Sequence, residues 1–266
     1  MRDLGGHVYN KLLLGILLSF TLSLNNLFAS NNSESSLAKG LKKLVVIAEA
    51  SYPPVTFKND KGEADGLASE VAKCIFKKLN INKSIRLDPW SRAYKSLNTV
   101  PHCVVFSVAR TKQRESMYQW VGPIYYMKTS FYVKKNSDIV INSLDDARLV
   151  PKIGAYFEAY DEQYLSSLGF NNLEATTNNI LNVKKLMNGR FTMISATNVT
   201  IGSMLKEAGY KQDDIKGVYN FLNVGVYFAF SKDVPFEVVV AWRRALEEMK
   251  DDGTLLKLRK KWLGDF

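Results

Sequence analysis

The chain has 266 residues, of which 46% are hydrophobic and 23% are charged. This balance can bury a core and excludes a disordered chain. Lysine and arginine outnumber the acids by 36 to 26, which gives a formal net charge of +10. The densest basic cluster, at residues 257–261, alternates with apolar residues as on the solvated side of an amphipathic helix. The charge therefore does not indicate nucleic-acid binding, although a positive surface also suits an anionic membrane or an acidic partner.

The N-terminus has the order of a secretory signal peptide. A polar leader with two basic residues precedes an apolar run at residues 12–20, and Leu27-Phe28-Ala29 offers a cleavage site before a polar stretch. We therefore predict a signal peptide at residues 1–29 and export to the periplasm. A retained membrane anchor is the alternative, but the apolar run is shorter than the roughly 20 residues of a bilayer span.

The first half of the mature chain alternates short apolar runs with amphipathic segments. The β-branched run at 44–48 predicts a buried strand, and 66–79 places its apolar residues on one helical face. This alternation indicates a parallel sheet with helices packed on it. The expected elements are strands at 44–48, 81–87 and 104–106, and helices at 66–79 and 91–97.

A strand at 130–134 leads into a second α/β series, and a strand at 224–230 leads back. The last two helices then follow, separated by a stop at 251–253. If these helices return to the first lobe, that lobe is discontinuous and two strands form a hinge. The other expected elements are strands at 152–156 and 191–195, and helices at 161–168, 178–188, 199–208, 235–250 and 254–262.

The chain has two cysteines, Cys74 and Cys103. In an oxidising compartment they fit either one disulfide bridge or two buried thiols. The sequence does not choose between these alternatives, because the bridge depends on the distance between the two residues in the fold.

Several short motifs, in this order, resemble the periplasmic solute-binding proteins of polar amino-acid ABC transporters, bacterial extracellular solute-binding protein family 3. The resemblance covers nearly all of residues 41–264. It implies the α/β type II periplasmic-binding-protein fold, in which two lobes, each a mostly parallel sheet flanked by helices, are joined by two hinge strands. Lobe 1 would comprise 41–132 with 225–266, and lobe 2 would comprise 133–224. The motifs are Tyr52-x-Pro54, Asp65-Gly66, the segment from Ser107 to Arg114, Val224-Gly225-Val226, and the ending from Asp252-Gly253-Thr254 to Trp262.

The Thr-x-x-Arg element carries the predicted ligand contact. In the family this arginine clamps a ligand carboxylate, and the serine upstream is a second donor; Thr111, Arg114 and Ser107 occupy these positions. A guanidinium offers a bidentate fork to a carboxylate, which agrees with that role. The alternative is a surface arginine in the first turn of a helix.

Four further residues are candidates for the cleft. Tyr52 is similar to the aromatic residue that stacks on the ligand in relatives, although it also suits a core position. Glu49 matches a position that often contacts the distal group of the ligand. Trp90 would reach the cleft or pack within its helix. Arg110 would hold a second anionic group or form a surface salt bridge.

Two departures from the family pattern affect the ligand. Where the family has an aspartate for the ligand's α-ammonium, this chain has Thr197. The family's Gly-Thr-Thr anion turn is replaced by Glu158-Ala159-Tyr160, and Glu158 or Asp161 could stand in for the missing acid. We expect a small polar, carboxylate-bearing ligand: an amino acid, a peptide fragment or a related organic acid.

The predicted function is capture of this ligand by hinge closure and its delivery to the permease of an ABC transporter. We expect a monomer that binds neither a metal, a cofactor nor nucleic acid, and that is not an enzyme. The first alternative is an enzyme on the same fold, similar to cyclohexadienyl dehydratase. His102 and Cys103 do not support it, because adjacent residues of a strand point to opposite faces. The second alternative is a sensing module for a separate receptor.

Overall fold

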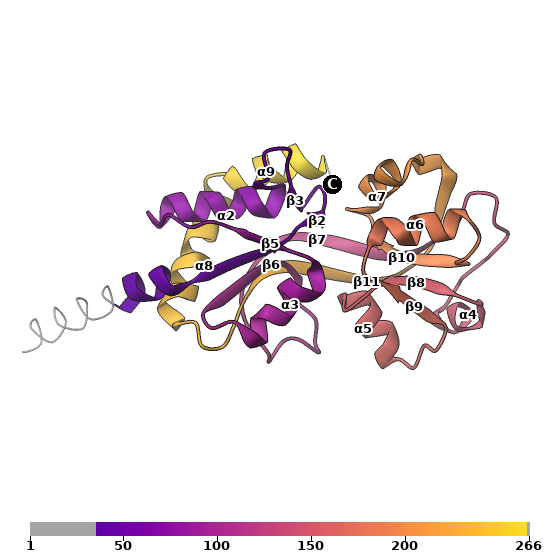
Figure 1. Ribbon diagram of the computed structural model, residues 1–266, viewed down its shortest axis with the longest axis horizontal. Coiled ribbons are helices and arrows are strands. Elements are labelled where there is room, and N and C mark those ends of the chain that lie inside the picture. The colour runs from indigo at the N-terminus through magenta and orange to yellow at the C-terminus, as the bar shows by residue number, and fades with distance from the viewer. Residues whose placement is uncertain (1–35, 265–266) are drawn as a thin grey trace, which may run out of the picture.

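The computed structural model describes residues 36–264, and the predicted signal peptide at residues 1–29 lies outside them. Two groups of helices lie around one continuous sheet of eight strands, with the order β5-β1-β6-β11-β7-β10-β8-β9 (Figure 1). Among residues 36–264, no helix combines the length and the apolar character needed to cross a bilayer.

The first lobe is built on β1, which pairs in parallel with β5 and β6. Side chains alternate across this strand, so that Val46 and Ala48 face α2, α8 and α9, while Ile47 faces α3. A small three-stranded sheet, β2-β3-β4, follows β1. The elements are β1 (Val45–Glu49), β2 (Ser51–Tyr52), β3 (Thr56–Lys58), β4 (Ala64–Asp65), α2 (Leu67–Lys78), β5 (Arg86–Asp88), α3 (Trp90–Thr99), β6 (Cys103–Ala109), α8 (Phe236–Asp251) and α9 (Thr254–Leu263).

The second lobe has the same layered plan around β8, which pairs in parallel with β9 and β10. Helices α6 and α7 cover one face with Ile194, and α4 and α5 cover the other with Met193. The elements are α4 (Leu144–Leu149), β8 (Ile153–Tyr156), α5 (Tyr160–Ser167), β9 (Leu173–Thr176), α6 (Asn179–Met187), β10 (Met193–Thr197), α7 (Ile201–Ala208) and the 3-10 turn η1 (Gln212–Asp214).

Two long strands, β7 (Gln119–Lys134) and β11 (Ile215–Phe230), join the lobes. They pair antiparallel with three register shifts, and Figure 1 shows them running from one group of helices to the other. The lobe boundaries predicted at 132/133 and 224/225 fall inside these two strands and remain predictions.

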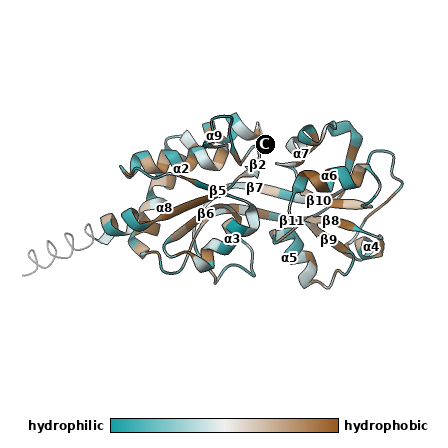
Figure 2. Ribbon diagram, viewed as in Figure 1, coloured by the Kyte–Doolittle hydropathy of each residue, from teal (hydrophilic) through white to brown (hydrophobic). Residues whose placement is uncertain are grey.

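The core of the first lobe explains why the chain returns to it. Trp242 of α8 is fully buried and makes edge contacts with Phe228 and Phe230 of β11, with ring centroids 5.2 Å apart in both cases. Burying an aromatic side chain of this size stabilises the folded state by several kcal/mol. Figure 2 shows the hydrophobic residues concentrated in the strands and the hydrophilic residues on the outer faces of the helices.

The predicted elements are present, with corrections at their ends. The strand expected at 81–87 is only three residues long, from Arg86 to Asp88. Its first part is instead an irregular segment in which Ile81 and Ile85 pack against the core and Lys83 donates to the carbonyl oxygen of Lys42 at 2.5 Å. The strand expected at 191–195 begins two residues later, at Met193.

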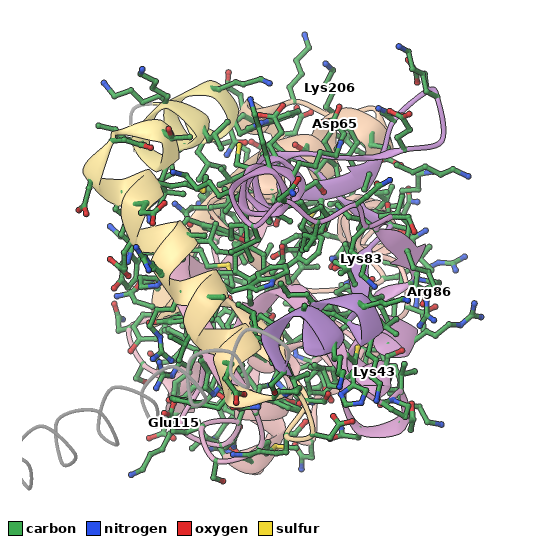
Figure 3. The ribbon with its side chains drawn as sticks, turned by 90° about the vertical axis from the view of Figure 1, so that its left-hand side faces the viewer. Lys43, Asp65, Lys83, Arg86, Glu115 and Lys206 are labelled. Carbon is green, nitrogen blue, oxygen red and sulfur yellow. The ribbon has the colours of Figure 1, made fainter. Side chains whose placement is uncertain are left out.

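The surface of the first lobe carries part of the positive charge. Lys43, Lys83 and Arg86 lie along one side of this lobe (Figure 3). Arg86 forms an ion pair with Asp88 at 2.8 Å.

Cys74 and Cys103 are both free thiols, and burial raises the pKa of Cys103 to about 12. Of the two alternatives left open by the sequence, the structure has the separate thiols.

Candidate functional site

A cavity lies where strands of both lobes end. Glu49 ends β1 and Ala109 ends β6 in the first lobe, while Tyr156 ends β8 and Thr197 ends β10 in the second. Ligand sites of α/β sheets are usually found outside the carboxyl ends of the strands. The cavity has a volume of about 40 Å³, room for a few water-sized groups. Its lining is Glu49, Tyr52, Trp90, Ser107, Ala109, Met127, Tyr156, Ala159, Tyr160, Asp161, Asn179, Ser195, Ala196, Thr197, Thr200 and Met204.

Glu49 is a buried carboxyl group in the wall of the first lobe, with only 3% of its surface exposed. The hydroxyl of Tyr156, from the second lobe, donates to Oε1 of Glu49 at 2.7 Å. Burial raises the pKa of Glu49 to about 8, although the hydrogen bond from Tyr156 opposes this shift. The same burial, together with the nearby Glu49, raises the pKa of Tyr52.

Asp161 is a second buried carboxyl group, in the first turn of α5. It accepts a hydrogen bond from the hydroxyl of Ser195, which lies on β10. Burial raises the pKa of Asp161, while Ser195 and the backbone N–H groups of α5 counteract part of the shift. The helix N-terminus thus stabilises a carboxylate that belongs to the protein.

Two polar groups in the lining have no hydrogen-bond partner in the described structure. They are the hydroxyl of Ser107 and the indole Nε1 of Trp90, and both residues are more than nine-tenths buried. Ser107 also has a φ of +66°, an unfavourable conformation for a residue with a side chain. An unpaired buried polar group costs about 1–3 kcal/mol. These groups are therefore expected to bond to a ligand or to water.

Arg114, the predicted carboxylate clamp, is 1% exposed and does not belong to the cavity lining. Its Nε and Nη2 donate to Oε1 of Gln163 at 3.2 and 2.9 Å, and Nη2 also donates to the carbonyl oxygen of Glu158 at 3.2 Å. Its guanidinium lies over the ring of Tyr94, 4.4 Å from the centroid. We call this cluster of Arg114, Tyr94, Glu158 and Gln163 the arginine corner. The second lobe fills the fork that was predicted to face the ligand.

The other predicted residues separate into two groups. Glu49, Tyr52, Trp90, Ser107 and Thr197 line the cavity, whereas Arg110, Thr111 and Glu158 do not.

Arg110 forms an ion pair with Glu115, which agrees with the salt-bridge alternative. Arg110 and Thr111 line a different cavity of about 360 Å³. Glu158, with a φ of +59°, contributes only its carbonyl oxygen to the arginine corner.

Sequence reasoning missed Tyr156, Gln163 and Ser195. A usable signal existed for Tyr156, because it ends a predicted parallel strand of the second lobe and such ends converge at the cleft. No such signal pointed to Gln163, whose contact with Arg114 joins positions 49 residues apart on different lobes. Within residues 36–264, no group of three or more His, Cys, Asp or Glu side chains is arranged to hold a metal ion.

The fold and the cleft can be compared with known proteins. The family model of the bacterial extracellular solute-binding proteins, family 3, matches residues 44–265. The chain belongs to this family. The L-cystine-binding protein TcyA of Bacillus subtilis is 25% identical over 246 residues, which cover 91% of this chain and 90% of that protein. The arginine-binding extracellular protein ArtP of the same organism is 26% identical over 244 residues, covering 89% and 92%.

Solved structures confirm the two-lobe type II fold of this family 3 protein. An ancestral arginine-binding protein bound to arginine has a TM-score of 0.72 at 25% identity and covers 83% of this chain and 98% of that chain. A histidine kinase sensor domain has a TM-score of 0.75 at 18% identity, covering 83% and 96%. The ancestral amino acid-binding protein AncCDT-1, a precursor of cyclohexadienyl dehydratase, has a TM-score of 0.72 at 23% identity, covering 85% and 98%.

The last two likenesses show the fold alone. Both named relatives are binding proteins, and the family is one of extracellular solute-binding proteins; this agrees with the expectation that the chain binds a small solute and is not an enzyme.

Proposed function

We propose that this protein is exported to the periplasm, captures a small polar ligand by hinge closure and delivers it, as a monomer, to the permease of an ABC transporter. The observation that carries the proposal is the cavity, because both lobes supply its walls. Its position at the ends of β1, β6, β8 and β10 is that of a cleft which opens when the lobes separate.

Closure is supported by contacts that join the two lobes directly. Tyr156 donates to Glu49 across the cavity, and Gln163 accepts from Arg114 beside it. These contacts exist only when the lobes are together, so they favour the closed form. A ligand bound between the lobes adds further contacts in that form and shifts the population toward it.

The predicted carboxylate contact through Arg114 makes an additional demand. Oε1 of Gln163 occupies the Nε and Nη2 donors of the guanidinium, which a carboxylate would bind in a bidentate manner. An amino acid or organic acid would therefore have to displace Gln163 from Arg114. The binding role itself does not depend on this displacement.

The proposal is tested by thermal unfolding of the mature protein against a panel of amino acids, organic acids and amines. A ligand at about 100 times its dissociation constant stabilises the folded state by about 2.7 kcal/mol. Small-angle scattering should show a smaller radius of gyration with the same compound, and mass spectrometry should recover that compound unchanged.

Arg114→Ala, with the exposed Arg190→Ala as its control, tests the carboxylate clamp. If the clamp is correct, a carboxylate ligand stabilises the control but no longer the Arg114 variant. Equal stabilisation of both variants would contradict the clamp and leave the binding role. Conversion of the bound compound into a product would contradict the binding role.

A further inference from the structure

Helix α5 occupies the arginine fork that a ligand carboxylate was predicted to use. Gln163, on this helix, accepts two hydrogen bonds from Arg114, and the carbonyl oxygen of Glu158 just before the helix accepts another. Arg114 also lies outside the cavity lining. The strongest cation near the cleft is therefore already hydrogen-bonded to protein acceptors.

The N-terminus of α5 is occupied as well. Its free backbone N–H groups favour an anion, and the anion present is the carboxylate of Asp161 in the first turn. Ser195 donates to the same carboxylate. A ligand carboxylate at this place would face a carboxylate at close range and without water, which is unfavourable.

The remaining lining is acidic. It contains two carboxyl groups, those of Glu49 and Asp161, and none of the described lining residues is lysine, arginine or histidine. A buried carboxylate needs a cationic partner or a proton. Burial raises the pKa of both carboxyl groups, although the hydrogen bond from Tyr156 opposes the shift at Glu49, and Ser195 and the more distant charge of Arg114 oppose it at Asp161.

Two other features of the lining suit a cation. The aromatic side chains of Tyr52, Trp90, Tyr156 and Tyr160 offer ring faces, which attract ammonium groups. The hydroxyl of Ser107 is buried and unpaired, and its oxygen can accept a hydrogen bond from a ligand N–H.

We propose that the cavity binds an organic ammonium compound that has no carboxylate, with its cationic group held by the carboxylates of Glu49 and Asp161. This inference rests on the proposed binding role and replaces the carboxylate-bearing ligand by an amine. It follows from two observations: two buried acids lie in a lining whose described residues include no cation, and the guanidinium of Arg114, the predicted carboxylate site, is already hydrogen-bonded to protein acceptors.

A second cavity gives the ligand room for a tail. It has a volume of about 220 Å³ and shares Glu49, Tyr156 and Asn179 with the first. Apart from Glu49, its lining is uncharged. The cationic group therefore fills the small cavity, and a neutral or second basic group extends past Tyr156.

The test compares amines with their carboxylated counterparts by isothermal titration calorimetry. The pairs are cadaverine with lysine, agmatine with arginine, histamine with histidine, and ethanolamine with serine. At least one amine should bind, and its carboxylated counterpart should bind at least tenfold more weakly. This comparison uses the wild-type protein and needs no variant.

Variants then assign the site. Glu49→Gln and Asp161→Asn keep the shape of the side chain and should each weaken amine binding at least tenfold. The matched controls are Glu63→Gln, an exposed acid just before β4, and Asp145→Asn, an exposed acid in the first turn of α4. Unfolding without ligand shows whether each variant is folded.

Three outcomes overturn the inference: a carboxylated counterpart that binds as tightly as its amine, no amine that binds, or acid variants that bind like the controls. If a carboxylated compound binds as tightly as its amine and also closes the lobes, this inference fails but the proposed binding role stands. By contrast, if a bound amine is chemically converted, the proposed binding role fails, but the preference of the cavity for amines over carboxylates stands.

Discussion

The arginine corner and the cavity both adjoin the start of α5. They differ in the protein groups that contact their charged side chains. In the corner, the guanidinium of Arg114 has acceptors from Gln163 and Glu158 and an aromatic face from Tyr94. In the cavity, Glu49 and Asp161 have hydroxyl donors but no cation in the described lining. A charge satisfied within the protein holds the lobes together, whereas a charge left without a partner is available to a ligand.

This contrast also separates the cavity from the rest of the molecule. The chain has a net charge of +10, and labelled basic residues lie on the outside of the first lobe (Figure 3). Its most enclosed acids nevertheless line the cleft between the lobes. The net charge of this chain therefore does not predict the charge of the residues that line its cleft.

The largest effect is expected on the cavity side, from Glu49→Gln at alkaline pH. Burial raises the pKa of Glu49 from 4.5 to about 8, and the groups facing it are Tyr52, Tyr125 and Tyr156. The folded protein thus keeps a proton that the unfolded chain releases, so rising pH between about 5 and 8 favours unfolding. The variant has no carboxyl group to ionise, so at pH 9 it should be more stable than wild type by about 5 kcal/mol.

Urea unfolding of both proteins at pH 5, 7 and 9 measures this effect. The exposed Glu63→Gln is the control and should follow the wild-type curve. If the free energies of unfolding of wild type and Glu49→Gln change with pH in parallel, Glu49 is ionised in the folded protein at neutral pH. The cavity would then not differ from the arginine corner in the way proposed.

On the other side of the comparison, Arg114→Ala should lower the free energy of unfolding by about 3 kcal/mol. It removes a buried cation with hydrogen bonds to Gln163 and Glu158, and leaves those acceptors without a donor. The exposed Arg190→Ala should change it by less than about 0.5 kcal/mol. Guanidinium unfolding compares the two variants, and equal stabilities would mean that the corner does not hold the lobes.

Gln163→Ala should make the corner resemble an open carboxylate site. The variant removes the hydrogen bonds that Nε and Nη2 of Arg114 donate to Gln163. The side chain of Gln163 does not line the cavity, so the cavity itself is unchanged. We expect the ratio of amine to amino-acid affinity to fall about tenfold, or 1.4 kcal/mol. Calorimetry with cadaverine and lysine measures the ratio, and an unchanged ratio would show that Gln163 does not exclude carboxylates.

The smallest effect is expected from Tyr156→Phe, which removes the hydrogen bond across the cavity to Glu49. Loss of one such bond costs about 1 kcal/mol, so the ratio of closed to open form should fall roughly fivefold. A pair of fluorescent labels, one on each lobe, reports the change as a lower transfer efficiency without ligand. Tyr210→Phe is the matched control, because Tyr210 is half-buried against the core of the second lobe just after α7 and does not line the cavity.

The sequence predicted most of the fold because local patterns determine it. The apolar face of α2 and the β-branched strand β1 are visible in short windows, and the first is buried along Leu67, Val71 and Ile75. The short strands β2, β3 and β4 were missed because two or three residues show no periodicity. The predicted strands at 130–134 and 224–230 are only parts of β7 and β11, whose other residues alternate less clearly.

The site was predicted only in part, for a different reason. Glu49, Tyr52 and Ser107 follow the family motif and line the cavity. The motif also predicted the position of Arg114, but its partners depend on the closed arrangement of the lobes. The segment that starts at Glu158 departs from the family pattern, so the sequence offered Asp161 only as a possible substitute for the missing acid, and Gln163 only as a residue of the helix expected at 161–168.

The β7–β11 ribbon has a mechanical consequence. Its pairing is interrupted by register shifts between Gly217 and Tyr219, between Asn220 and Leu222, and between Val226 and Phe228. Such irregularities leave a residue unpaired and increase the local twist. The ribbon joins the two lobes, so the twist at these shifts contributes to the angle between them. Deleting one unpaired residue would change this angle, and with it the width of the cleft, without touching a residue that lines the cavity.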